Sequence, residues 1–127
     1  IKICHRFVIT DLIFYIHSIF FERRIFMTIN VERDFELVTL EVAGRLDTTT
    51  APNLEAVISE LSGDIKELVF NVSELEYISS AGIRVLLGAY KKMHSNQGIM
   101  RIEKANDIVR EVFEITGLTE MLEQSNN

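Results

Sequence analysis

Two adjacent serines, Ser79 and Ser80, are the residues of this sequence best placed for chemistry. They lie in the stretch ELEYISSAGIRVLLGAYKKM, where an extended run gives way to a helical pattern. A hydroxyl at a helix start can accept a hydrogen bond from a free backbone N–H and so cap the helix. An exposed hydroxyl there can also be phosphorylated, because the helix dipole favours a negative charge at this end. The spacing alone leaves both roles open.

A catalytic serine would need a base, and the sequence does not supply one near Ser80. The nucleophile motif G-x-S-x-G is half matched, since Gly82 follows Ser80 but Ile78 stands where the first glycine is needed. His94 lies further along the same predicted helix, about 20 Å from Ser80 at the usual helical rise. This separation is far outside hydrogen-bond reach, so we do not expect a hydrolase.

The sequence also lacks the motifs of other enzyme classes. The sequence contains neither of the glycine-rich motifs that hold nucleotide phosphates, and no pair of His or Cys residues has metal-ligand spacing. We therefore expect a binding protein with no catalytic residue, no metal site and no cofactor.

The composition of the chain limits its domain count, the partners that it can bind and the compartment in which it acts. The chain has 127 residues, of which 47% are hydrophobic, so it fits one domain with a substantial core. Its net charge of −6 argues against direct nucleic-acid binding, which needs a basic surface. The only cysteine, Cys4, cannot form an intramolecular disulfide, which favours a reducing, cytoplasmic location.

Residues 1–26 differ from the rest of the chain. They are rich in Ile and Phe, and their longest run without Asp, Glu, Lys or Arg, Leu12 to Phe21, has ten residues, fewer than the roughly 20 of a membrane span. We interpret 1–26 as an N-terminal extension outside the domain, from upstream or added sequence, and 27–127 as the domain. A membrane-surface anchor is the alternative, and its basic residues would be Lys2, Arg6, Arg23 and Arg24.

From Met27 onward the apolar residues alternate between the periods of strands and helices. Residues 29–44 predict a hairpin whose strands are joined across Glu32 to Glu36. The next segment predicts a helix capped by Asp47 and the threonines after it, with Pro52 in the first turn and Gly63 at the end.

Two more strands and two more helices follow. Residues 65–72 and 98–105 predict strands. The helix that begins at the serines places Ile83, Leu86, Leu87 and Tyr90 in the core, and a last helix runs from Asn106 or Asp107 to Gly117. Right-handed crossovers then give an α/β fold with a mixed, mostly parallel sheet, an N-terminal hairpin and helices packed against the sheet.

Three segments resemble the STAS domain of bacterial anti-sigma factor antagonists. They are GRLDTTTAPNLE at 44–55, LVFNVSELEYISSAGIRVLLGAYKKM at 68–93 and VREVFEITGLTEML at 109–122, and the resemblance covers residues 28–122. It implies a STAS fold and a role in transcription regulation. In that family the unphosphorylated protein binds a partner that is both anti-sigma factor and serine kinase, which frees a sigma factor, and phosphorylation ends the binding. A phosphatase is then also expected.

The resemblance implies that Ser80 is phosphorylated, with Ser79 as the alternative, since the best-known members have Asp at the position of Ser79. It also implies that Asp47 helps to position the nucleotide end of the kinase. Small residues after Ser80 would let a kinase approach closely, and the basic Arg84 follows one turn later. The predicted partner-binding residues are Asp47, Ser79, Ser80, Ala81, Gly82 and Arg84. The alternative is a STAS-type scaffold or transport-associated subunit without serine phosphorylation.

Overall fold

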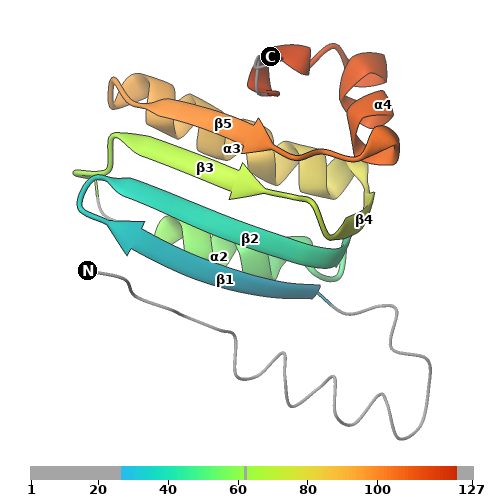
Figure 1. Cartoon of the computed structure of the whole chain (residues 1–127), viewed down its shortest axis with the longest axis horizontal. Coiled ribbons are helices and arrows are strands. Elements are labelled where there is room, and N and C mark those ends of the chain that lie inside the picture. Colours follow the sequence, from blue (N-terminus) through green and yellow to red (C-terminus); the bar gives the residue numbers. More distant parts are fainter. Residues whose placement is uncertain (1–26, 62, 123–127) are drawn as a thin grey trace, which may run out of the picture.

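The structure, a computed structural model, describes residues 27–61 and 63–122. Within these ranges it contains a five-stranded mixed sheet and three α-helices (Figure 1). The α/β class and the N-terminal hairpin predicted from the sequence are confirmed. The extension assigned to residues 1–26 lies outside the described residues, so that boundary stays a prediction.

The hairpin consists of β1 (Met27–Asp34) and β2 (Leu37–Leu46), which pair antiparallel along their length. Only Phe35 and Glu36 connect the strands, and Phe35 has a left-handed backbone with φ of 58°. The longer connection predicted from Glu32 was wrong, because Glu32 is still paired with Thr39 in the ladder.

The remaining strands are parallel to β2. Strand β3 (Glu67–Asn71) pairs with the first half of β2, and β5 (Ile99–Glu103) pairs with β3. The short β4 (Leu75–Ile78) pairs with the second half of β2, beyond the end of β3. The sequence had not predicted β4 as a separate strand, yet it sets the position of the two serines that follow it.

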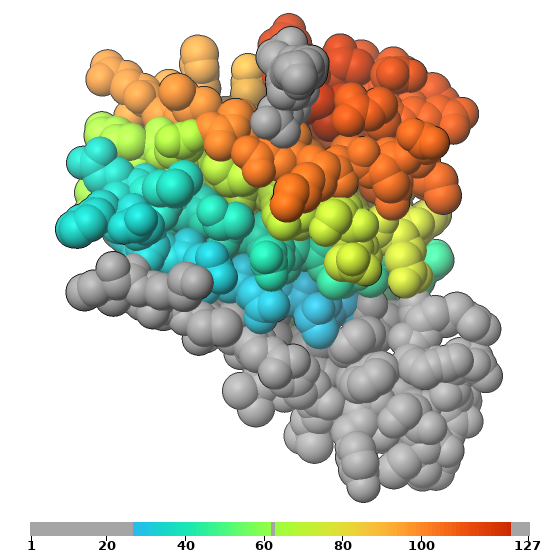
Figure 2. Space-filling model, viewed as in Figure 1, coloured from blue at the N-terminus to red at the C-terminus, as the bar shows by residue number. Residues whose placement is uncertain are grey.

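Helices α2 (Ala51–Ser59) and α3 (Ser80–Ser95) lie behind the sheet in Figure 1 and contact each other. Helix α4 (Asp107–Thr116) contacts β4, and the 3₁₀ helix η1 (Thr119–Met121) follows it. Alternate strand residues form buried rows across the sheet, such as Val31, Leu40, Phe70 and Ile102. On the other side, Figure 2 shows side chains of the hairpin, β3 and β5 at the surface.

Helix ends agree with the prediction in α4 and differ in α2. Asn106 caps α4 by accepting a hydrogen bond from the Val109 N–H at 2.9 Å, and Gly117 ends it in the left-handed conformation. Helix α2 stops at Ser59 with Glu60 as its C-cap, so the predicted end at Gly63 was wrong.

The buried stripe of α3 also differs in part from the prediction. Ile83 and Leu86 are buried as expected, and Tyr90 packs partly buried against the core. Leu87 is only half-buried, and Ala89 occupies the buried position in its place. None of the helices in the described ranges has the length and apolar character needed to cross a bilayer.

Candidate functional site

Ser79 and Ser80 differ sharply in their surroundings. Ser79 is the N-cap of α3, with extended backbone, and its Oγ accepts a hydrogen bond from the Gly82 N–H at 3.4 Å. Its carbonyl accepts from the Ile83 N–H at 2.9 Å. Ser80 is the first residue of α3 and is exposed, and its hydroxyl forms no hydrogen bond with any described residue. The capping role therefore belongs to Ser79, and the hydroxyl of Ser80 is accessible.

Gly82 is buried beneath this corner, and a side chain there would collide with the sheet. A Cβ at this position would lie 2.6 Å from Leu46 Cγ and 3.1 Å from Ile78 Cγ1. The absence of a side chain lets the first turn of α3 lie directly on β2 and β4. Internal packing thus explains the glycine, and a contact of Gly82 or its half-buried neighbour Ala81 with a partner remains a prediction.

Asp47 closes a tight turn between β2 and α2. Its Oδ1 accepts hydrogen bonds from the Thr49 hydroxyl at 2.7 Å and the Thr49 N–H at 3.0 Å. Its own N–H donates to Thr50 Oγ1 at 2.9 Å. Asp47 and the threonines after it were predicted to cap α2. The N-cap is indeed one of these threonines, Thr50, but its side chain makes no capping bond. Asp47 instead stabilises the turn that precedes the helix.

The hydrogen bonds of Asp47 also set its charge. Burial raises the pKa of this carboxyl, but the hydrogen bonds from Thr49 and Thr50 together outweigh burial and hold the pKa below its ordinary value. The carboxylate is therefore ionised at neutral pH, and its position in the turn is fixed by the bonds that it accepts.

One backbone contact joins the two halves of the site. The Ser79 N–H donates to the carbonyl oxygen of Leu46 at 2.9 Å, and Leu46 is paired with Ile78. Asp47 and Ser79 are the residues directly after this pair, so the structure brings them to one corner of the sheet. Arg84 is exposed one helical turn beyond Ser80. The predicted residues thus lie in one region, whereas their contact with a partner is untested.

The first turn of α3 carries no acidic residue. The positive end of the helix dipole is therefore not compensated by a side chain of that turn. A negative group attached to the exposed Ser80 hydroxyl would supply the missing compensation, because free amides at a helix N-terminus bind anions. The helix dipole therefore favours a negative group at the position of Ser80.

Sequence reasoning missed two residues beside this corner, Arg45 on β2 and Tyr77 on β4. The register pairs them, and the guanidinium carbon of Arg45 lies 4.2 Å from the centroid of the Tyr77 ring. Arg45 Nε is also 3.8 Å from Asp47 Oδ2. The ladder is irregular between Gly44 and Arg45, so no simple alternation would have placed the arginine against the tyrosine.

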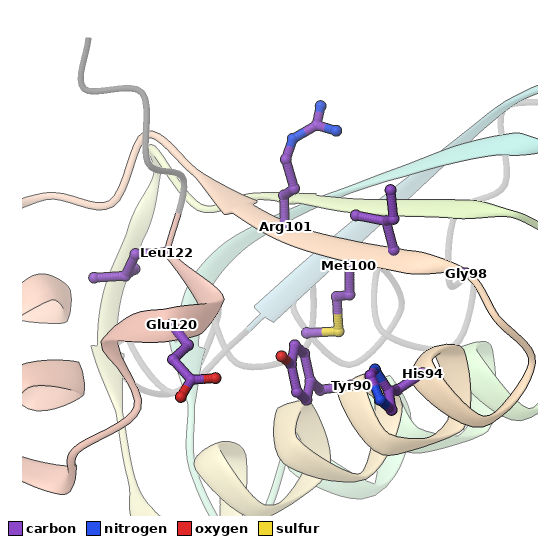
Figure 3. Close-up of a pocket in the computed structure, with 8 residues that line it drawn as sticks. Tyr90, His94, Gly98, Met100, Arg101, Glu120 and Leu122 are labelled. Carbon is purple, nitrogen blue, oxygen red and sulfur yellow. The ribbon is translucent and has the colours of Figure 1, made fainter.

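A cavity of about 310 Å³ lies at the opposite end of α3 from the serines. Tyr90 and His94 line it, and in Figure 3 they lie on the side of β5 to which Met100 points. The Arg101 side chain points away from them, and its guanidinium pairs with Glu67 and Glu103. This hollow does not belong to the serine corner.

The chain is similar to bacterial proteins named anti-sigma-B factor antagonists. It is 32% identical over 98 residues to the anti-sigma-B factor antagonist of Listeria monocytogenes, covering 75% of this chain and 84% of that protein.

Solved structures show the same architecture. An anti-sigma factor antagonist from Mycobacterium paratuberculosis superposes with a TM-score of 0.69 at 27% identity, covering 79% of this chain and 87% of that one. The unphosphorylated form of the anti-sigma factor antagonist SpoIIAA superposes with a TM-score of 0.66 at 22% identity, covering 75% of this chain and 85% of that one. The STAS domain model matches residues 27–127. The chain therefore belongs to the STAS domain family.

Proposed function

We propose that this protein is an anti-sigma factor antagonist controlled by phosphorylation of Ser80. The unphosphorylated form binds an anti-sigma factor that is also a serine kinase, and this binding frees a sigma factor for transcription. Phosphorylation of Ser80 ends the binding, and a phosphatase restores it. The protein acts in the cytoplasm, binds no nucleic acid itself and catalyses no reaction.

One observation carries the proposal: Ser80 is exposed at the first position of α3 while its neighbour Ser79 caps the helix. The shared similarity to proteins named anti-sigma factor antagonists supports the general function. The division of roles between the serines supports Ser80 as the modified residue, because its hydroxyl can be phosphorylated without removing the cap.

The physical effect of the phosphate lies at the interface and not in the fold. A phosphate carries a charge of about −1.5 to −2, which the helix N-terminus accommodates. The same charge at a protein contact must be desolvated and meets any acidic group of the partner. A difference of about 3 kcal/mol would weaken the affinity about a hundredfold. The domain can therefore stay folded while its binding is lost.

The test uses the anti-sigma factors encoded in the same genome, each purified and mixed with this protein and ATP. Wild-type protein should bind one of them and then be released as phosphate accumulates. Ser80→Ala should bind and stay bound. Ser80→Asp should bind more weakly than Ser80→Ala, though less weakly than the phosphorylated protein, because Asp adds only one negative charge.

The competing function is a STAS-type scaffold or transport-associated subunit without serine phosphorylation. It would be supported if the wild-type protein bound none of these anti-sigma factors and received no phosphate from any of them. That result would overturn the proposed function.

A further inference from the structure

Arg45 and Tyr77 lie side by side on a part of the sheet that the core does not use. Their neighbours Leu46 and Ile78 are buried under α3, so the alternation of strands directs Arg45 and Tyr77 to the opposite face. The side chain of Arg45 is 32% exposed, and Tyr77 is 38% exposed. The pair is therefore available to a partner.

The pair is continuous with the serine corner along both strands. Tyr77 on β4 lies two residues before Ser79, and Arg45 on β2 lies two residues before Asp47. The bond from the Ser79 N–H to Leu46 O holds the two strand ends together. A partner that reaches Asp47 and Ser79 at the strand ends would lie two residues along each strand from Arg45 and Tyr77.

The side chain of Arg45 is held in place, but part of its hydrogen-bonding capacity is unused within the described residues. Its guanidinium rests on the Tyr77 ring, and its one ion pair within the described ranges reaches Asp47 through Nε at 3.8 Å, beyond hydrogen-bond distance. The two terminal nitrogens donate to no described residue, so they can bind a carboxylate in the bidentate manner typical of arginine. Because the side chain is already ordered, binding would cost little further conformational entropy.

The net charge of the domain affects which partner groups can approach its surface. Without residues 1–26, which hold four basic and two acidic residues, nine basic and seventeen acidic residues remain, a net charge of −8. A partner carboxylate would be repelled by most of this surface and attracted at Arg45. Arginine and tyrosine are also among the residue types that most often contribute a large share of interface affinity.

We propose that Arg45 and Tyr77 form a second contact for the anti-sigma factor, in which Arg45 binds an acidic side chain and Tyr77 packs against apolar surface. This inference rests on the proposed function, since it extends the same interface from Ser80 onto the open face of the sheet. It also specifies which groups the anti-sigma factor should present at this contact, namely a carboxylate beside an apolar patch.

The test measures the dissociation constant of the complex by calorimetry, using the anti-sigma factor that binds wild type and a non-hydrolysable ATP analogue. Arg45→Ala and Tyr77→Ala should each weaken binding at least tenfold. Tyr77→Phe should retain binding because the ring remains, whereas Arg45→Lys should weaken it because lysine lacks the planar fork. Thermal unfolding of each variant checks that the fold is kept.

The matched controls are Lys66→Ala and Phe35→Ala, which remove an exposed cation and an exposed aromatic side chain at the opposite end of β2. Both should bind within twofold of wild type. If Arg45→Ala and Tyr77→Ala bind as tightly as these controls, the inference is overturned while the proposed function stands. If wild type binds no anti-sigma factor, the proposed function itself fails.

Discussion

The backbone N–H of Ser79 donates to the carbonyl oxygen of Leu46 across 2.9 Å. This bond extends the pairing of β2 and β4 by one step, to the point where β4 becomes α3. It places the turn of Asp47 and the cap of α3 at one corner, although the two segments are more than thirty residues apart in sequence. The geometry of the candidate site therefore depends on how closely the start of α3 lies against β2.

Gly82→Ala is expected to destabilise the domain by about 1–3 kcal/mol, because the new methyl group would overpack the contact with Leu46 and Ile78. Urea unfolding measures the change. Gly88→Ala is the matched control, since a Cβ there meets no atom within 4 Å and the position is an exposed helix interior. This control should stabilise the domain by about 0.5–1 kcal/mol. Equal stability of the two variants would contradict the packing explanation.

Ser79→Ala is expected to cost about 1 kcal/mol of unfolding free energy, because it removes the side chain that caps α3. Ser80→Ala should change stability by less than about 0.5 kcal/mol, since the Ser80 hydroxyl is exposed. The same urea titration compares them. A larger loss for Ser80→Ala than for Ser79→Ala would reverse the roles assigned to the two serines.

Asp47 should make the stability of the domain sensitive to acid. Its pKa is lower in the folded protein than the ordinary value of about 3.9 expected in the unfolded chain. As the pH falls through this range, the unfolded state takes up the proton first, so the stabilisation present at neutral pH is progressively lost.

Asp47→Asn removes this titration, and the difference in unfolding free energy between wild type and variant should shrink as the pH falls from about 7 toward 3. Urea unfolding across that range provides the measurement. A constant difference for Asp47→Asn at all pH values would show that its hydrogen bonds contribute nothing specific to the charged form.

Local signals in the sequence predicted most of the elements correctly. The caps of α4 at Asn106 and Gly117 were readable because each uses side-chain or backbone chemistry that few residues provide. The end of α2 was not, since Glu60 and the residues after it carry no strong stop signal before Gly63. Strand β4 was missed because it has only four residues.

The parts of the site that depend on residues close together in the sequence were predictable. Ser79 and Ser80 stand at the start of a helix that the sequence pattern predicts, so the cap could be anticipated. The contact between Arg45 and Tyr77 depends on the register of two strands and on an irregularity in their ladder. Such long-range pairing is not encoded in the residues on either side of the contact, and only the folded chain shows it.

The most direct test of the account is to locate the phosphate by mass spectrometry after incubation with the cognate anti-sigma factor kinase and ATP. We predict one phosphate on Ser80 in wild type and in Ser79→Ala, and none in Ser80→Ala. Phosphate on Ser79 with Ser80 unmodified would contradict the assignment. No phosphate on either serine, with a kinase that binds this protein and is active on another substrate, would contradict the switch itself.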